Sequence, residues 1–209
     1  MKTTTFLATM AASVYATPTL FPGASTSQSQ CPANAAQPDG LLPKGSISTS
    51  VLLPISAKKP NKAFAATQWA QVTPNDMCTI FNLELPAAAT QGKICNLVFD
   101  FPSQLQAPGS FAFQGPGTVK FTGYAIGVGA VVGQTTYQNQ PAPGPSPPNP
   151  PPVLKPGHSY VVNSAPCGIP AEAGTVTVSG SLCSPDTTFI FKQCGEQCPM
   201  GFFVVLTDA

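Results

Sequence analysis

The chain has 209 residues, including 25 Pro, 18 Gly and 7 Cys, but only 8% of its residues are charged. An average soluble domain has roughly 25% charged residues. All nine basic residues are Lys, and nucleic-acid recognition depends on Arg forks and basic patches, so we expect no nucleic-acid partner. The low charge excludes a long charged helix or coiled coil, and the 43% hydrophobic content excludes disorder throughout the chain. We therefore expect a small, nearly neutral, loop-rich globular protein.

Residues 1–16 have the features of a secretory signal peptide. Lys2 supplies the positive start, Phe6 to Val14 form a short apolar stretch, and Val14 and Ala16 occupy the recognition positions before a cleavage site. We predict cleavage after Ala16 and a secreted protein. The apolar stretch is shorter than the roughly 20 residues that span a bilayer, and we expect no transmembrane segment elsewhere.

Residues 17–45 are rich in Pro, Ser and Gln and lack apolar periodicity, which is typical of a flexible segment. From residue 46 onward, short runs of β-branched and aromatic residues alternate with polar ones and end at Pro or Gly, as strands do. The predicted strands are 47–55, 80–85, 96–101, 111–113, 118–122, 128–132, 159–162, 175–182, 187–191 and 202–206. This pattern predicts an all-β fold, a single antiparallel β-sandwich over residues 46–209.

Residues 141–156 hold nine Pro in sixteen positions. Because Pro cannot donate to a sheet ladder, this stretch is predicted to be a long Pro-rich loop inserted between two strands.

All seven Cys lie after the predicted cleavage site. In an oxidising compartment they predict up to three disulfides and one odd thiol. Cys31 lies within 17–45 and would pin that segment to the domain. We favour Cys95 with Cys167, and Cys183 with either Cys194 or Cys198, while the sequence leaves other pairings open.

The side chains that could carry chemistry are few. His158 is the only His, so we expect no metal site, no cofactor and no catalytic triad. Glu84 and Asp100 lie on the less apolar faces of two strands that could be neighbours. Two carboxylates about 5–10 Å apart can hydrolyse a glycosidic bond. We favour the simpler interpretation that alternation turns both acids toward water, with an ordinary pKa for Asp100.

Several motifs in a fixed order resemble a known family. They are Thr79 to Pro86 (TIFNLELP), Gly92 to Pro102 (GKICNLVFDFP), Phe113 to Gly117 (FQGPG), Thr135 to Asn139 (TTYQN), Pro156 to Tyr160 (PGHSY) and Pro199 to Phe203 (PMGFF). Over residues 46–209 the chain resembles the fungal family named the ubiquitin 3 binding protein C-terminal domain. The resemblance implies a secreted or surface-associated, β-rich protein, and it brings no catalytic motif. The name also implies an intracellular ubiquitin-pathway partner, which the signal peptide and the cysteines argue against.

These observations predict a secreted, non-enzymatic fungal protein with a structural or ligand-binding role at the cell surface or in the cell wall. Its candidate partners are a cell-wall glycan or an extracellular protein. One alternative is a polysaccharide hydrolase that uses Glu84 and Asp100, and another is a secreted effector that binds a host protein through the Pro-rich loop. Aromatic side chains exposed beside a cleft would favour glycan binding, whereas close carboxylates in a pocket would favour hydrolysis.

Overall fold

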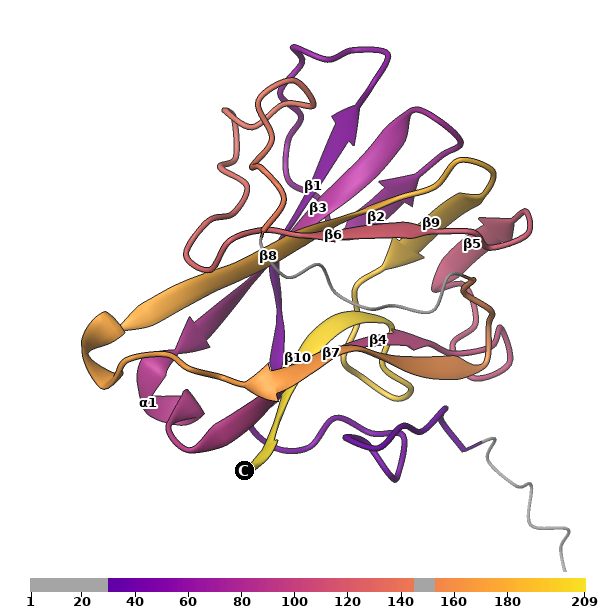
Figure 1. Ribbon diagram of the computed structural model, residues 1–209. Coiled ribbons are helices and arrows are strands. Elements are labelled where there is room, and N and C mark those ends of the chain that lie inside the picture. Colours follow the sequence, from indigo (N-terminus) through magenta and orange to yellow (C-terminus); the bar gives the residue numbers. More distant parts are fainter. Residues whose placement is uncertain (1–29, 145–152) are drawn as a thin grey trace, which may run out of the picture.

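The computed structural model describes residues 30–144 and 153–209 (Figure 1). The predicted signal peptide, residues 17–29 and the centre of the Pro-rich insert lie outside these ranges. The regular elements are β1 (Ile47–Ser56), β2 (Trp69–Val72), β3 (Met77–Pro86), α1 (Ala87–Thr90), β4 (Lys93–Phe101), β5 (Phe111–Gln114), β6 (Lys120–Gly123), β7 (His158–Pro166), the 3-10 turn η1 (Ala171–Ala173), β8 (Thr175–Cys183), β9 (Thr188–Lys192) and β10 (Gly201–Asp208). Within the described part of the chain, no helix has the length and apolar content needed to cross a membrane.

The strands form two antiparallel sheets. Seven strands follow the order β6-β8-β3-β1-β10-β4-β7, and three follow the order β2-β9-β5. The large sheet curls, and the small sheet packs against part of its concave face, at the right of the view in Figure 1. The fold is the predicted all-β sandwich.

The core between the sheets is built from phenylalanine rings. Phe99 on β4 is fully buried, and its ring centroid lies 4.6 Å from that of Phe202 and 5.4 Å from that of Phe191. Phe81 stacks on Phe202 with 3.9 Å between the ring centroids. Alternation places these rings on the inner face of each strand, as the sequence pattern predicts.

A loop after β6 covers the outer face of β1 and β3, at the upper left of Figure 1. Its residues Tyr124 and Ala130 pack against Leu53, Ile55 and Ile80. The side chain of Asn82 donates to the carbonyl of Ala130 at 2.9 Å and accepts from its N–H at 3.0 Å. The predicted strand at 128–132 is therefore wrong, because this apolar run serves as a cover rather than joining a ladder.

Residues 30–45, here called the N-terminal strap, cover the outer face of β10 and β4. Ala36 and Leu42 of the strap pack against Val98, Phe203 and Val205. Figure 1 shows the strap in indigo, running along the lower side of the sandwich below β10, β7 and β4. This part of the segment expected to be flexible is thus packed on the domain. The composition of residues 30–45 does not reveal this packing, because the strap is attached to the domain by only one disulfide and a few side chains.

Three disulfides join segments that are distant in sequence: Cys31–Cys198, Cys78–Cys183 and Cys95–Cys167. Cys95–Cys167 agrees with the favoured pairing, and Cys31 holds the strap as expected. The favoured partner for Cys183 is wrong, because the β3–β8 ladder brings Cys78 beside it. Cys194 carries a free thiol.

Candidate functional site

The candidate binding site is an apolar groove of about 510 Å³ on the concave face of the large sheet. The small sheet covers one half of this face, where the phenylalanine core lies. The other half carries Leu85 of β3, Leu97 of β4, Val178 of β8 and Val204 of β10, and these line the groove. The start of β8 and α1 lie at the left of Figure 1, on the opposite side from the small sheet.

The groove is apolar because it continues the inward-facing rows of the core. Leu97 and Phe99 share one face of β4, and Leu83 and Leu85 share one face of β3. Val204 lies opposite Leu97 in the β10–β4 ladder. The same rows that supply the core under the small sheet therefore continue into the groove, where Leu97 and Val178 are half-buried and Leu85 and Val204 stay buried.

The wall on the β7 side is held by the Cys95–Cys167 disulfide, and both of its cysteines line the groove. Ile126 lies at the mouth and is 69% exposed. Its side chain extends the apolar lining at this end of the groove. The described residues that line the groove carry no charged side chain, so an uncharged ligand fits it best.

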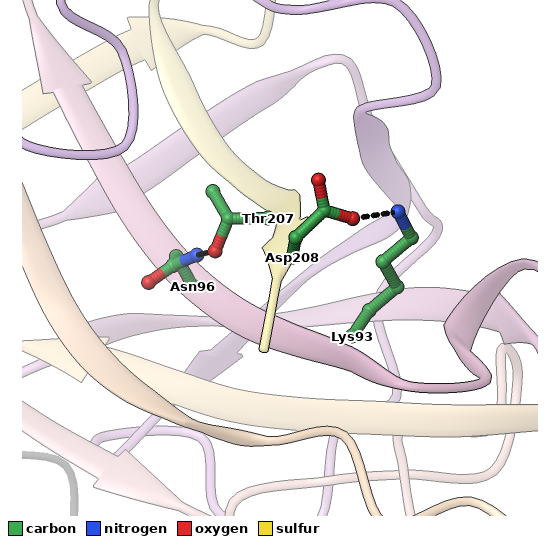
Figure 2. Close-up of polar contacts among 4 residues, drawn as sticks. All are labelled: Lys93, Asn96, Thr207 and Asp208. Carbon is green, nitrogen blue, oxygen red and sulfur yellow. Dashed lines mark hydrogen bonds and ion pairs between the residues drawn. The ribbon is translucent and has the colours of Figure 1, made fainter.

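Polar contacts between β4 and β10 stabilise the strand register that places Leu97 and Val204 in the groove (Figure 2). Asn96 donates from Nδ2 to Oγ1 of Thr207 and to the carbonyl of Val205, both at 3.1 Å. Lys93 and Asp208 face each other at the end of the ladder and form an ion pair, which holds the pKa of Asp208 below its usual range. These contacts keep Leu97 and Val204 side by side on the opposite face.

Asp100 belongs to a second feature, a buried polar cluster under the strap. Its side chain is 1% exposed, accepts a hydrogen bond from Nε2 of Gln37 at 3.0 Å, and accepts another from the hydroxyl of Ser159. Asn34 donates to Ser159 Oγ at 2.6 Å and to Gln37 Oε1 at 2.7 Å. Burial raises the pKa of Asp100 to about 6, against the lowering effect of these hydrogen bonds.

The expectation that Asp100 faces water with an ordinary pKa is therefore wrong. Strand alternation correctly places Asp100 on the outer face of β4, but the strap covers this face and excludes water from it. Sequence reasoning also missed Asn34 and Gln37, because polar residues in a linker-like segment carry no periodic pattern. It missed Ser159 because the β4–β7 pairing that places it opposite Asp100 is a long-range property. Cys31 was the one available sign that this segment is attached.

Glu84 and Asp100 do not form a pair. Glu84 is half-buried on the outer face of β3, where its carboxylate accepts a hydrogen bond from Thr177 of β8 at 3.0 Å. Strands β1 and β10 separate β3 from β4, so the carboxylates are roughly three strand spacings, or about 14 Å, apart. This exceeds the separations used for glycoside hydrolysis, about 5–10 Å.

The remaining candidates are also dispersed. His158 is exposed at the start of β7 and its Nδ1 lies 3.1 Å from the carbonyl of Pro156, in the expected turn. Cys194 is partly buried next to the end of β9. In the described ranges, His, Cys, Asp and Glu side chains form no group of three that could hold a metal ion.

Fold and groove together define a disulfide-linked β-sandwich with an apolar groove on its concave face. The family model of the Ubiquitin 3 binding protein But2 C-terminal domain matches residues 50–196. The match covers more than half of the chain, and the chain belongs to this family. The family is named after a protein described as binding ubiquitin 3, which is a binding role and not an enzymatic one. A comparison with curated proteins finds no match.

Proposed function

We propose that this chain is a secreted, non-enzymatic binding protein that holds an uncharged, apolar segment of an extracellular partner protein in its inner groove. The observation that carries the proposal is the apolar groove on the concave face, where Leu97 and Val178 of the core rows are only half-buried. A contiguous apolar surface in a concave site often marks a place of interaction. Pockets of about 300–1,000 Å³ with mostly apolar walls are typical of binding sites.

Two further observations favour a protein partner outside the cell. The family name describes a protein-binding protein, although it names an intracellular pathway. Three disulfides and the predicted signal peptide favour an oxidising compartment. We therefore keep the binding role and place the partner at the cell surface or in the medium.

The two alternative functions have less support. The hydrolase needs Glu84 and Asp100 close together, and the sheet order separates them. The effector hypothesis relies on the Pro-rich insert, whose residues 145–152 lie outside the described ranges.

The test uses selection from a displayed library of random peptides on the purified mature protein. We expect enrichment of peptides with an apolar, uncharged centre. Binding of a selected peptide should shift the NMR signals of the Leu85, Leu97, Val178 and Val204 methyl groups. Enrichment of charged peptides, or shifts confined to another surface, would contradict the proposal.

A pair of matched variants makes this test specific. Ile126→Asp places a charge at the mouth of the groove, and Val131→Asp places the same charge on a 51% exposed position of the same loop, outside the groove. We expect Ile126→Asp to weaken peptide binding roughly tenfold or more and Val131→Asp to leave it unchanged. Secretion is tested separately, by N-terminal sequencing of the protein from culture medium, with Thr17 expected as the first residue.

A further inference from the structure

Trp69 is the only tryptophan of the chain and its side chain is 37% exposed. It is the first residue of β2, an edge strand of the small sheet. Most of the large rings in the described ranges lie in the core instead, as Phe99, Phe189 and Phe202 do, and Tyr137 is the other exposed one. An indole ring kept partly in water gives up stabilising burial, which is typical of a binding surface.

The strand register shows which face Trp69 occupies. Trp69 lies opposite Lys192 in the β2–β9 ladder, while the next pair, Ala70 and Phe191, is fully buried. Side chains of directly opposite residues leave a sheet on the same face. Trp69 and Lys192 therefore both lie on the outer face of the small sheet, away from the core.

A polar cleft of about 510 Å³ is lined by residues that adjoin Trp69 in the chain and in the sheet, although Trp69 itself is not one of its lining residues. Lys192 is one of its lining residues, and so is Gln68, the neighbour of Trp69 in the chain. Hydroxyl groups of Ser48 and Thr67 also line it. Unlike the inner groove, this cleft offers mainly polar atoms, and the two sites have no lining residue in common.

Three of the polar side chains that line the cleft are free to bind a ligand. Gln68, Lys192 and Glu196 make no side-chain hydrogen bond or ion pair with any residue in the described ranges. They offer an amide, an ammonium group and a carboxylate, so donors and acceptors are both present. The two charges cancel, and the cleft does not select for an anion or a cation.

We infer that Trp69 and this cleft form a binding site for a neutral sugar unit of a polysaccharide. A pyranose ring has a face of C–H groups that can stack on an indole ring. Its hydroxyl groups both donate and accept hydrogen bonds, which matches the mixed amide, ammonium and carboxylate groups of the cleft. A phosphate ligand would require unopposed positive charge, and Glu196 opposes Lys192. A lipid chain would require an apolar lining.

Because Trp69 is the only tryptophan, its fluorescence reports on this site alone. We would titrate the mature protein with soluble oligosaccharides of β-1,3-glucan, chitin and mannan, and measure retention on the corresponding insoluble polysaccharides. At least one sugar should change the emission in a saturable manner. Trp69→Ala should then weaken retention on that polysaccharide roughly tenfold or more, Trp69→Phe should weaken it less, and Gln68→Ala should weaken it severalfold.

The control is Leu105→Ala, at a position that is 90% exposed and outside the cleft, and it should bind like the unaltered protein. Melting temperatures verify that each variant is folded. The inference is overturned if none of the sugars changes the emission, or if folded Trp69→Ala or Trp69→Phe protein keeps full retention.

The inference is independent of the proposed peptide groove. Ile126→Asp should leave sugar binding intact, and Trp69→Ala should leave peptide binding intact. If retention on polysaccharide is lost in Ile126→Asp but kept in Trp69→Ala, the sugar site is not at Trp69.

Discussion

Gln37 donates a hydrogen bond of 3.0 Å to the buried carboxylate of Asp100, although 63 positions separate the two residues in the chain. The contact joins the strap to β4 and removes a charged group from water. An ionised carboxylate in such surroundings costs stability unless it is fully compensated. The strap is therefore coupled to the protonation of one residue.

The first prediction concerns pH. The pKa of Asp100 is raised from 3.8 to about 6 in the folded protein, so the folded state binds this proton more tightly than the unfolded state does. Its contribution to stability is fully present below about pH 4 and is lost as the pH rises through 6. The shift corresponds to a contribution on the order of 3 kcal/mol. We expect the free energy of unfolding in urea to fall between pH 5 and pH 7.

Variants show whether Asp100 is the cause. Asp100→Asn should remove most of this pH dependence, because the amide does not titrate. Glu84→Gln, on the outer face of the same sheet, is the matched control and should retain it. A free energy of unfolding that rises from pH 5 to pH 7 would contradict the prediction.

The second prediction concerns the Cys31–Cys198 disulfide, which closes a loop of 167 residues. Replacing both cysteines by Ser should lower the free energy of unfolding by about 2–5 kcal/mol. Because the strap is then held only by side chains, amide hydrogen exchange should accelerate around Gln37, and the pKa of Asp100 should fall as water reaches it. Cys194→Ser serves as the control. Unchanged exchange at Gln37 in the double variant would show that the disulfide does not hold the strap.

The third prediction concerns the aromatic core. Phe99→Ala should lower the free energy of unfolding by about 3–5 kcal/mol, because it leaves a cavity among the rings of Phe191, Phe202 and their neighbours. Leu105→Ala should change it by less than about 0.5 kcal/mol. Equal effects of the two substitutions in denaturant unfolding would contradict this account of the core.

The fourth prediction compares two polar contacts of the β4–β10 ladder. Asn96 is buried, bonds to Thr207 and Val205, and accepts from Ser164 Oγ at 2.7 Å. Asn96→Ala should therefore cost about 1–3 kcal/mol, because buried partners lose their hydrogen bonds. Lys93→Ala removes an exposed ion pair with Asp208 and should cause no measurable loss of stability. The prediction fails if Lys93→Ala is the more damaging variant.

The sequence predicts those parts of the fold that depend on local alternation. Phe99 and Phe101 were correctly placed on one buried face, and β3, β4, β8 and β10 lie close to their predicted ranges. Alternation assigns a residue to a face but does not show what covers that face. Asp100 is the clearest example, because the cover comes from a segment 63 positions away.

The candidate sites were harder to predict than the strands. The sequence pattern assigns Leu97 and Val178 to the core. They line a groove because the small sheet does not extend over this part of the large sheet, which the pattern does not show. β2 has four residues of mixed character, too few for a periodic signal, so the surface position of Trp69 could not be assigned. The partner of Cys183 was missed for a related reason, since strand order is a long-range property.

The position of β10 has a consequence for the synthesis of the protein. Strand β10 follows the other strands in the chain and lies between β1 and β4 in the large sheet, so the sheet cannot close until residues 201–208 have been synthesised. Until then, β1 and β4 each have an unpaired edge, which exposes them to incorrect pairing with other chains. A chain truncated before Gly201 would lack a central strand as well as Phe202 of the core, and it should fail to fold and aggregate.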